Sequence, residues 1–150
     1  MPIDWGTAAA TVITGTLILA IGQVVQRWMA EPMLAVRAAI GGVDFAVTYH
    51  ANVYMNPGPW EDRPRREAVL NCSDEFRRLA AQLSASSRAA PGWLRWLPLG
   101  VPSRRRVDEA VGAMIGMSYL VVDGDPGRVD QNRKDARECR TTIARCLRLR

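Results

Sequence analysis

The stretch that decides the fold is Trp5 to Gln26, WGTAAATVITGTLILAIGQVVQ, which contains no charged residue. Asp4 precedes this stretch and Arg27 follows it directly. A helix rises about 1.5 Å per residue, so roughly 20 apolar residues are enough to cross the hydrocarbon core of a bilayer. The stretch therefore predicts an N-terminal transmembrane helix. We place within this span, or at its ends, Trp5, Gly15, Gly22, Gln26 and Trp28.

The residues that flank this span predict a retained anchor and its orientation. A secretory signal opens with basic residues, whereas residues 1–4 contain none. Cleavage after the small-x-small sequence Ala20–Gly22 is the alternative. Basic residues, Arg27 and Arg37, occur only on the C-terminal side, so the positive-inside rule places the N-terminus outside the cell. We expect a single-pass protein of the bacterial inner membrane with its body in the cytoplasm.

Length and charge limit what the rest of the chain can be. The chain has 150 residues and a net charge of +5. About 120 residues remain after the span, which suits one small domain with its own core. We therefore divide the chain into an anchor, residues 1–31, and a soluble domain, residues 32–150. The basic residues alternate with acidic ones along the chain, so the sequence does not favour nucleic-acid binding.

The soluble domain shows the apolar periodicity of helices and no convincing strand pattern. We expect a kink or break at Glu31-Pro32, because proline disfavours the helical conformation of the residue before it. A continuous helix is expected from Pro32 to about Asn56, with apolar positions spaced by three and four residues. These positions are Met33, Val36, Ile40, Val43, Val47, His50 and Tyr54. Gly41-Gly42 lies inside this helix and suggests a close helix crossing.

Three further amphipathic helices are expected after loops rich in proline and glycine. Their approximate ranges are 64–89, 104–122 and 129–149. Ser103 is a suitable N-cap for the second of them, and Asp108 and Glu109 fall in its early turns, where negative charge is favoured. Four amphipathic helices with short connections predict an all-α fold, in which a transmembrane helix precedes a soluble domain like a four-helix bundle.

The segment 91–102, PGWLRWLPLGVP, combines tryptophans and leucines with three prolines. It is too short to span a bilayer. One interpretation is a loop that plugs the bundle, and the other is a loop that enters the interfacial layer of the membrane, where tryptophan and arginine are favoured. The candidate lipid-contacting residues are Trp93, Trp96, Arg104, Arg105 and Arg106.

The sequence contains no catalytic motif that we can identify. Its single histidine, His50, has Asp44, Cys72 and Cys139 as candidate partners for nucleophilic or metal chemistry, but no spacing is diagnostic. A histidine on an apolar stripe is more often a core residue. We therefore assign no catalytic residue, metal ligand or cofactor, and the three cysteines are expected on buried faces. A possible polar site comprises His50, Asn52 and Tyr54.

One stretch resembles a group of small bacterial membrane proteins. These proteins have one N-terminal span followed by an EPxxxxRxxIG…YxANVYxNPG pattern, and here Glu31-Pro32, Arg37, Ile40-Gly41 and residues 49–58 match it. The segment Trp93–Arg106 is also similar. The group has no assigned activity, so the resemblance implies architecture and membrane location and no catalytic residue.

The sequence thus favours a domain that acts by interaction or as a scaffold. The expected partners are the lipid bilayer and a second copy of the chain or another membrane protein. Two alternatives stay open: a membrane-tethered enzyme or metal-binding protein centred on His50, and a membrane-active protein of phage or plasmid type.

Overall fold

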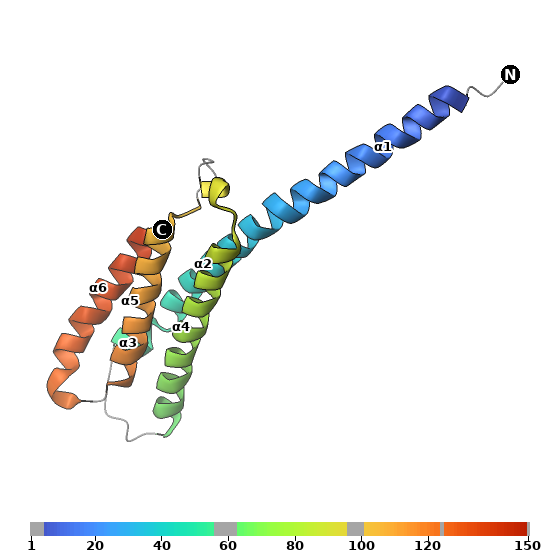
Figure 1. The fold of residues 1–150 in the computed structure, drawn as a ribbon. Helices are drawn as coiled ribbons and strands as arrows, with labels where there is room; N and C mark the ends of the chain where they lie inside the picture. The colour runs from blue at the N-terminus through green and yellow to red at the C-terminus, as the bar shows by residue number, and fades with distance from the viewer. Residues whose placement is uncertain (1–4, 56–62, 96–100, 124, 150) are drawn as a thin grey trace.

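The computed structural model describes residues 5–55, 63–95, 101–123 and 125–149, which form helices joined by short connections (Figure 1). No strand occurs among these residues, and the predicted fold class is confirmed. The elements are α1 (Trp5–Val25), η1 (Gln26–Ala30), α2 (Glu31–Tyr49), α3 (Ala51–Met55), α4 (Arg63–Ala89), η2 (Gly92–Arg95), α5 (Arg104–Val122), η3 (Pro126–Arg128) and α6 (Val129–Leu147).

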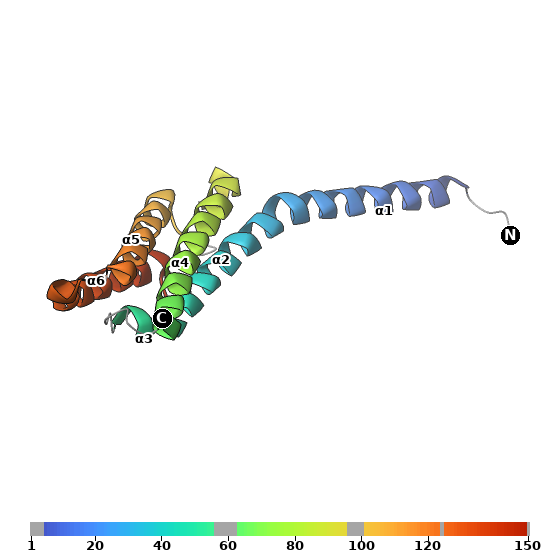
Figure 2. The same ribbon diagram turned by 90° about the horizontal axis from the view of Figure 1, so that it is seen from below.

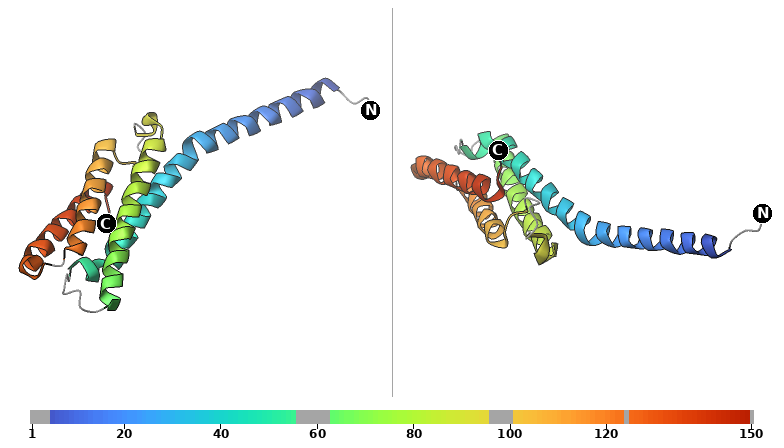
Figure 3. Two further views of the ribbon diagram at one scale, coloured as in Figure 1. Left: turned by 60° about the horizontal axis from the view of Figure 1, so that its bottom comes forward. Right: turned by 90° about the horizontal axis from the view of Figure 1, so that it is seen from above.

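The helix expected to kink or break at Glu31-Pro32 is kinked and not broken. A single helix runs from Ala10 to Tyr49 and widens to a π-helical turn at η1. The N–H of Glu31 donates to the carbonyl of Gln26, five residues earlier. In an α-helix the ring of Pro32 would clash with the carbonyl four residues before it, and the wider turn relieves this clash. The helix bends here instead of ending (Figures 2 and 3).

The helices α2, α4, α5 and α6 pack side by side in chain order and alternate in direction (Figure 1). The short helix α3 packs against α4, α5 and α6. In all views α1 extends away from this bundle alone (Figures 1 to 3). The alternation places the ends of α4 and α6 and the start of α5 at the end of the bundle from which α1 leaves.

The core consists of the apolar stripes that the sequence predicts. The α2 positions Val36, Val43 and Val47 are buried, while Met33 and Ile40 are half-buried. The other helices contribute side chains from α4, α5 and α6 to the same cluster: Val69, Cys72, Phe76, Leu79, Leu83, Val107, Met114, Met117, Val121, Ala136, Ile143 and Cys146. The stripe of α2 is wider than predicted, because Ala39 and Ala46 are buried as well.

The predicted helix from 32 to 56 is wrong in one respect, because it is divided at His50. This residue caps the end of α2 with φ −87° and ψ 9°, and α3 continues in a new direction. The change of direction lets Tyr54 insert its ring beside Phe76, with ring centroids 6.2 Å apart, and Tyr54 is 2 % exposed. Burial of this large ring across the end of the bundle outweighs the continuation of a straight helix.

Smaller differences occur at the helix ends. Ser103 occupies the N-cap of α5 in an extended conformation, but its side chain makes no capping hydrogen bond. Asp108 and Glu109 lie in the second turn of α5, and the first turn contains no acidic residue, so the dipole effect on these two residues is weaker than at the helix start. The last helix ends at Leu147, and Arg148 adopts a left-handed conformation with φ 56°.

The two adjacent glycines of α2 provide a matched pair for a stability measurement. A Cβ on Gly42 would lie 3.2 Å from Cδ2 of the buried Leu79, which confirms the close helix crossing, whereas a Cβ on Gly41 would meet nothing within 4 Å. Gly41→Ala is therefore expected to stabilise the domain by about 0.5–1 kcal/mol, because alanine loses less backbone entropy in a helix. Gly42→Ala should gain less, since Leu79 must move. Chemical unfolding in detergent measures both, and a larger gain at position 42 would contradict the crossing geometry.

Candidate functional site

The helix α1 exposes apolar side chains around its whole circumference. Val12, Ile18 and Leu19 are each 65–68 % exposed, and the most apolar 18-residue window of the long helix has none of its residues buried in the structure. By length and composition, the helix Ala10–Tyr49 is the one helix among the described residues that is able to cross a membrane. A Cβ on Gly15 or Gly22 would meet nothing within 4 Å, so both glycines leave open surface on this helix.

A second exposed apolar surface continues along α2, on the side that faces away from the bundle. We call it the outer face of α2 and define it as Leu34, Ala38, Gly41, Phe45 and Tyr49, spaced by three or four residues. Leu34, Phe45 and Tyr49 are 59, 63 and 69 % exposed. The rings of Phe45 and Tyr49 are stacked, with centroids 5.4 Å apart. Exposed aromatic rings gathered on one helix face are typical of a binding surface.

The predicted polar site is only partly assembled. Nε2 of His50 lies 2.9 Å from Oε2 of Glu75 on α4, and His50 is 7 % exposed. Tyr54 donates its hydroxyl to the carbonyl of Val47 over 2.8 Å, and burial raises the pKa of this hydroxyl. Asn52 is exposed and lines a shallow cleft with Val53 and residues of α4. The structure therefore does not bring His50, Asn52 and Tyr54 into one network.

The partner of His50 is one that the sequence analysis missed. Glu75 also pairs with Arg78 over 3.5 Å, and the His50 ring lies between Tyr49 and Phe76 with centroid distances of 5.0 and 6.1 Å. This arrangement fixes the point where α2 turns into α3. In the sequence, the only sign that Glu75 faces the core was its place next to Phe76 on the apolar stripe of the 64–89 helix. Its pairing with His50 depends on the register between α2 and α4, which the sequence does not give.

The cysteines lie where a structural role predicts them. Cys72 and Cys146 are buried and Cys139 is half-buried, and all three are free thiols. Burial raises the pKa of the Cys72 thiol to about 12, and the nearby Glu75 carboxylate adds to this effect. A thiol with such a pKa stays protonated at neutral pH and is a poor nucleophile. Among the described residues, no three His, Cys, Asp or Glu side chains gather closely enough to hold a metal ion.

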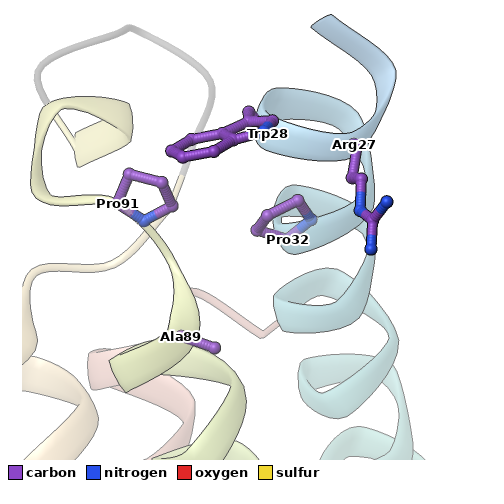
Figure 4. Close-up of a pocket in the computed structure, with 5 residues that line it drawn as sticks. All are labelled: Arg27, Trp28, Pro32, Ala89 and Pro91. Carbon is purple, nitrogen blue, oxygen red and sulfur yellow. The ribbon is translucent and has the colours of Figure 1, made fainter. Parts of the chain in front are cut away.

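A cleft of about 560 Å³ lies where the long helix meets the end of α4 (Figure 4). It is lined by Arg27, Trp28, Pro32, Ala89 and Pro91. The indole of Trp28 projects toward Pro91, whereas the Arg27 side chain points away from the cleft (Figure 4). Trp28 is 65 % exposed, so its ring lines the cleft but stays largely accessible to solvent.

The candidate residues Trp93, Arg104, Arg105 and Arg106 lie near the same end of the bundle. Trp93 in η2 is 46 % exposed. Arg104, Arg105 and Arg106 form the exposed first turn of α5. Trp96 lies outside the described residues, as does most of the loop between η2 and α5, so both interpretations of the 91–102 segment stay predictions. Trp5 begins α1, and Gln26 begins the π-helical turn.

The comparisons with known proteins leave the site to be interpreted from its own geometry. The resemblance to small single-span bacterial proteins stays a prediction. No protein-family model, curated protein or solved structure matches the chain.

Proposed function

We propose that this chain is a single-pass protein of the bacterial inner membrane, anchored by α1, whose helical domain lies in the cytoplasm and acts by binding a protein partner. The observation that carries the proposal is the apolar, uncharged and exposed surface of α1 from Ala10 to Val25. At about 25 cal/mol per Å² of apolar surface, leaving such a helix in water is strongly unfavourable. A bilayer covers it over its whole length.

The orientation follows from the charges that flank the helix. Arg27 lies in η1, two residues after the end of α1, and residues 1–4 contain no arginine or lysine. Trp5 and Trp28 bracket the span, as interfacial aromatic residues do in membrane helices. These features support an N-terminus outside and a cytoplasmic domain.

The outer face of α2 supports the interaction role. Phe45 lies 20 residues beyond Val25, the last residue of α1, which is about 30 Å along the helix. A bilayer that covers α1 does not reach that far, so lipid does not cover Phe45 and Tyr49. Because the partner must approach a helix continuous with the anchor, we propose a partner in the same membrane: a second copy of the chain or another membrane protein.

The anchor is tested by membrane fractionation. The wild-type chain is expected to sediment with membranes and to resist alkaline carbonate extraction. Leu17→Arg combined with Ile18→Arg should shift it to the soluble fraction, because each arginine in the middle of a span costs about 2.5–3.5 kcal/mol. Leu70→Arg, at a 42 % exposed position on α4, is the matched control and should stay in the membrane fraction.

Two results would contradict the proposal. Complete extraction of the wild-type chain by carbonate would exclude an integral anchor. Activity of a periplasmic reporter fused to the C-terminus, combined with inactivity of a cytoplasmic one, would reverse the orientation.

The contact between His50 and Glu75 favours a second candidate, a membrane-tethered enzyme or metal-binding protein. A part-buried histidine 2.9 Å from a carboxylate is a common arrangement for orienting an imidazole. Metal analysis of the purified chain separates the two candidates. A stoichiometric metal that His50→Ala removes would support the second one and overturn a purely interacting role.

A further inference from the structure

We infer that the end of the bundle nearest α1 is a docking surface for anionic phospholipids, so that the domain contacts the membrane surface in addition to being anchored by α1. The inference rests on the proposed anchor and extends it by naming a second membrane contact and its lipid chemistry. Its basis is the way the topology gathers basic side chains from separate helices at one end.

The basic residues at this end come from four different elements. The exposed ones are Arg27, Arg88, Arg104, Arg105, Arg106 and Arg148. They lie in η1, in the last turn of α4, in the first turn of α5 and at the end of α6, which the alternating directions of the helices place together (Figure 1). At the opposite end the basic residues are balanced by acidic ones: Asp123, before η3, pairs with Arg128, and Asp130, in the first turn of α6, pairs with Arg133.

The three arginines of α5 oppose the electrostatics of their own helix. The N-terminus of a helix carries partial positive charge and favours acidic residues, yet the first turn of α5 contains three arginines and no acid. Among the described residues, no carboxylate pairs with Arg104, Arg105 or Arg106. Their acidic neighbour Glu109 pairs with Arg145 over 2.8 Å instead. A local conflict of this kind is typical of a functional site, and an anionic surface resolves it.

Apolar and aromatic side chains beside the arginines fit the interfacial layer. Trp93 is 46 % exposed in η2, and Trp28 projects into the cleft beside Pro91 (Figure 4). Figure 1 shows η2 beside the point where α1 leaves the bundle, so a bilayer around α1 lies close to η2. Indole rings favour the headgroup level, and juxtamembrane arginines favour anionic lipids. Aromatic and basic groups therefore occur together where the membrane surface is expected.

The test uses the full chain inserted into lipid nanodiscs and measures amide hydrogen exchange. Discs of phosphatidylcholine are compared with discs that contain one-third phosphatidylglycerol. We expect slower exchange at residues 86–92 and 101–108 in the phosphatidylglycerol discs only. The protection should disappear at roughly 1 M salt, where the Debye length falls to about 3 Å.

Matched charge variants make the test specific. The triple variant R104Q, R105Q and R106Q should lose the protection, because each arginine near the surface contributes roughly fivefold, and three contribute roughly a hundredfold, to the docked population. It should be at least as stable as the wild type, since the helix-dipole conflict is removed. The control R65Q, R66Q and K134Q removes the same charge from exposed positions nearer the other end of the bundle and should keep the protection.

Each outcome has a distinct meaning. Equal exchange in both kinds of disc, or equal loss of protection in the two triple variants, would overturn the docking surface while the anchor stands. Failure of the chain to insert into either disc would overturn the anchor and this inference with it.

Discussion

Replacing Val43 by aspartate is expected to unfold the helical domain. Val43 is fully buried on the inner side of α2, within the core cluster. An unpaired carboxylate at a buried site costs about 3–5 kcal/mol, which is a large fraction of the stability of a small domain. Circular dichroism of the chain in detergent micelles measures the effect as a large loss of helix in the domain or a strongly lowered Tm.

The same substitution two residues further along separates folding from binding. Phe45 is 63 % exposed, so Phe45→Asp should change the free energy of unfolding by no more than about 0.5 kcal/mol. It should nevertheless abolish crosslinking from a photoreactive residue placed at the neighbouring exposed position Thr48 in native membranes. An unchanged crosslinking yield would exclude the outer face of α2 as the partner surface, and equal destabilisation by both substitutions would contradict the assignment of inner and outer faces.

Truncation of Phe76 is the second change with a large expected effect. Its ring is fully buried and lies near His50 and Tyr54, at centroid distances of 6.1 and 6.2 Å. Phe76→Ala is expected to destabilise the domain by about 3–5 kcal/mol, through lost burial and the cavity that remains. Because Phe76 supports both residues of the α2–α3 turn, α3 should lose its hydrogen-exchange protection first.

Tyr119→Ala provides the control for this measurement. Tyr119 is 63 % exposed, and its ring lies 5.0 Å from the guanidinium of Arg77. Its loss should cost less than about 1 kcal/mol, since cation–π contacts at exposed sites are weak. A cost for Phe76→Ala similar to that for Tyr119→Ala would contradict the central position of Phe76 in the core.

The fold class and most of the core could be predicted from the sequence because both depend on local periodicity. The stripes through Val43, Phe76 and Ile143 recur every three or four residues, and each lies on the buried side of its helix. Proline and glycine clusters marked the ends of the helices to within a few residues. These signals require no knowledge of which helix packs against which.

Features that depend on contacts between helices could not be predicted in this way. The pairing of His50 with Glu75 requires the register of α2 against α4, and the turn at His50 follows from the burial of Tyr54 beside Phe76. The π-helical turn before Pro32 was missed because a proline in a helix permits a break, a kink or a widened turn, and the sequence does not choose among them.

The outer face of α2 was visible in the sequence but was not used. Leu34, Phe45 and Tyr49 are large apolar residues that fall between the positions of the buried stripe. Large apolar residues on the side of an amphipathic helix that faces away from the core indicate a contact surface, because the core does not require them there.

The single wide turn at η1 also sets the rotation of α2 about the helix axis relative to α1. An α-helix advances about 100° per residue, so the one extra residue in this turn rotates α2 about its axis relative to α1. It therefore decides which side of the exposed apolar surface of α1 points in the same direction as Phe45 and Tyr49. Tilting or twisting of α1 is transmitted through a continuous helix to the bundle, and deleting one residue from 26–30 would rotate the two aromatic rings by about a quarter of a turn.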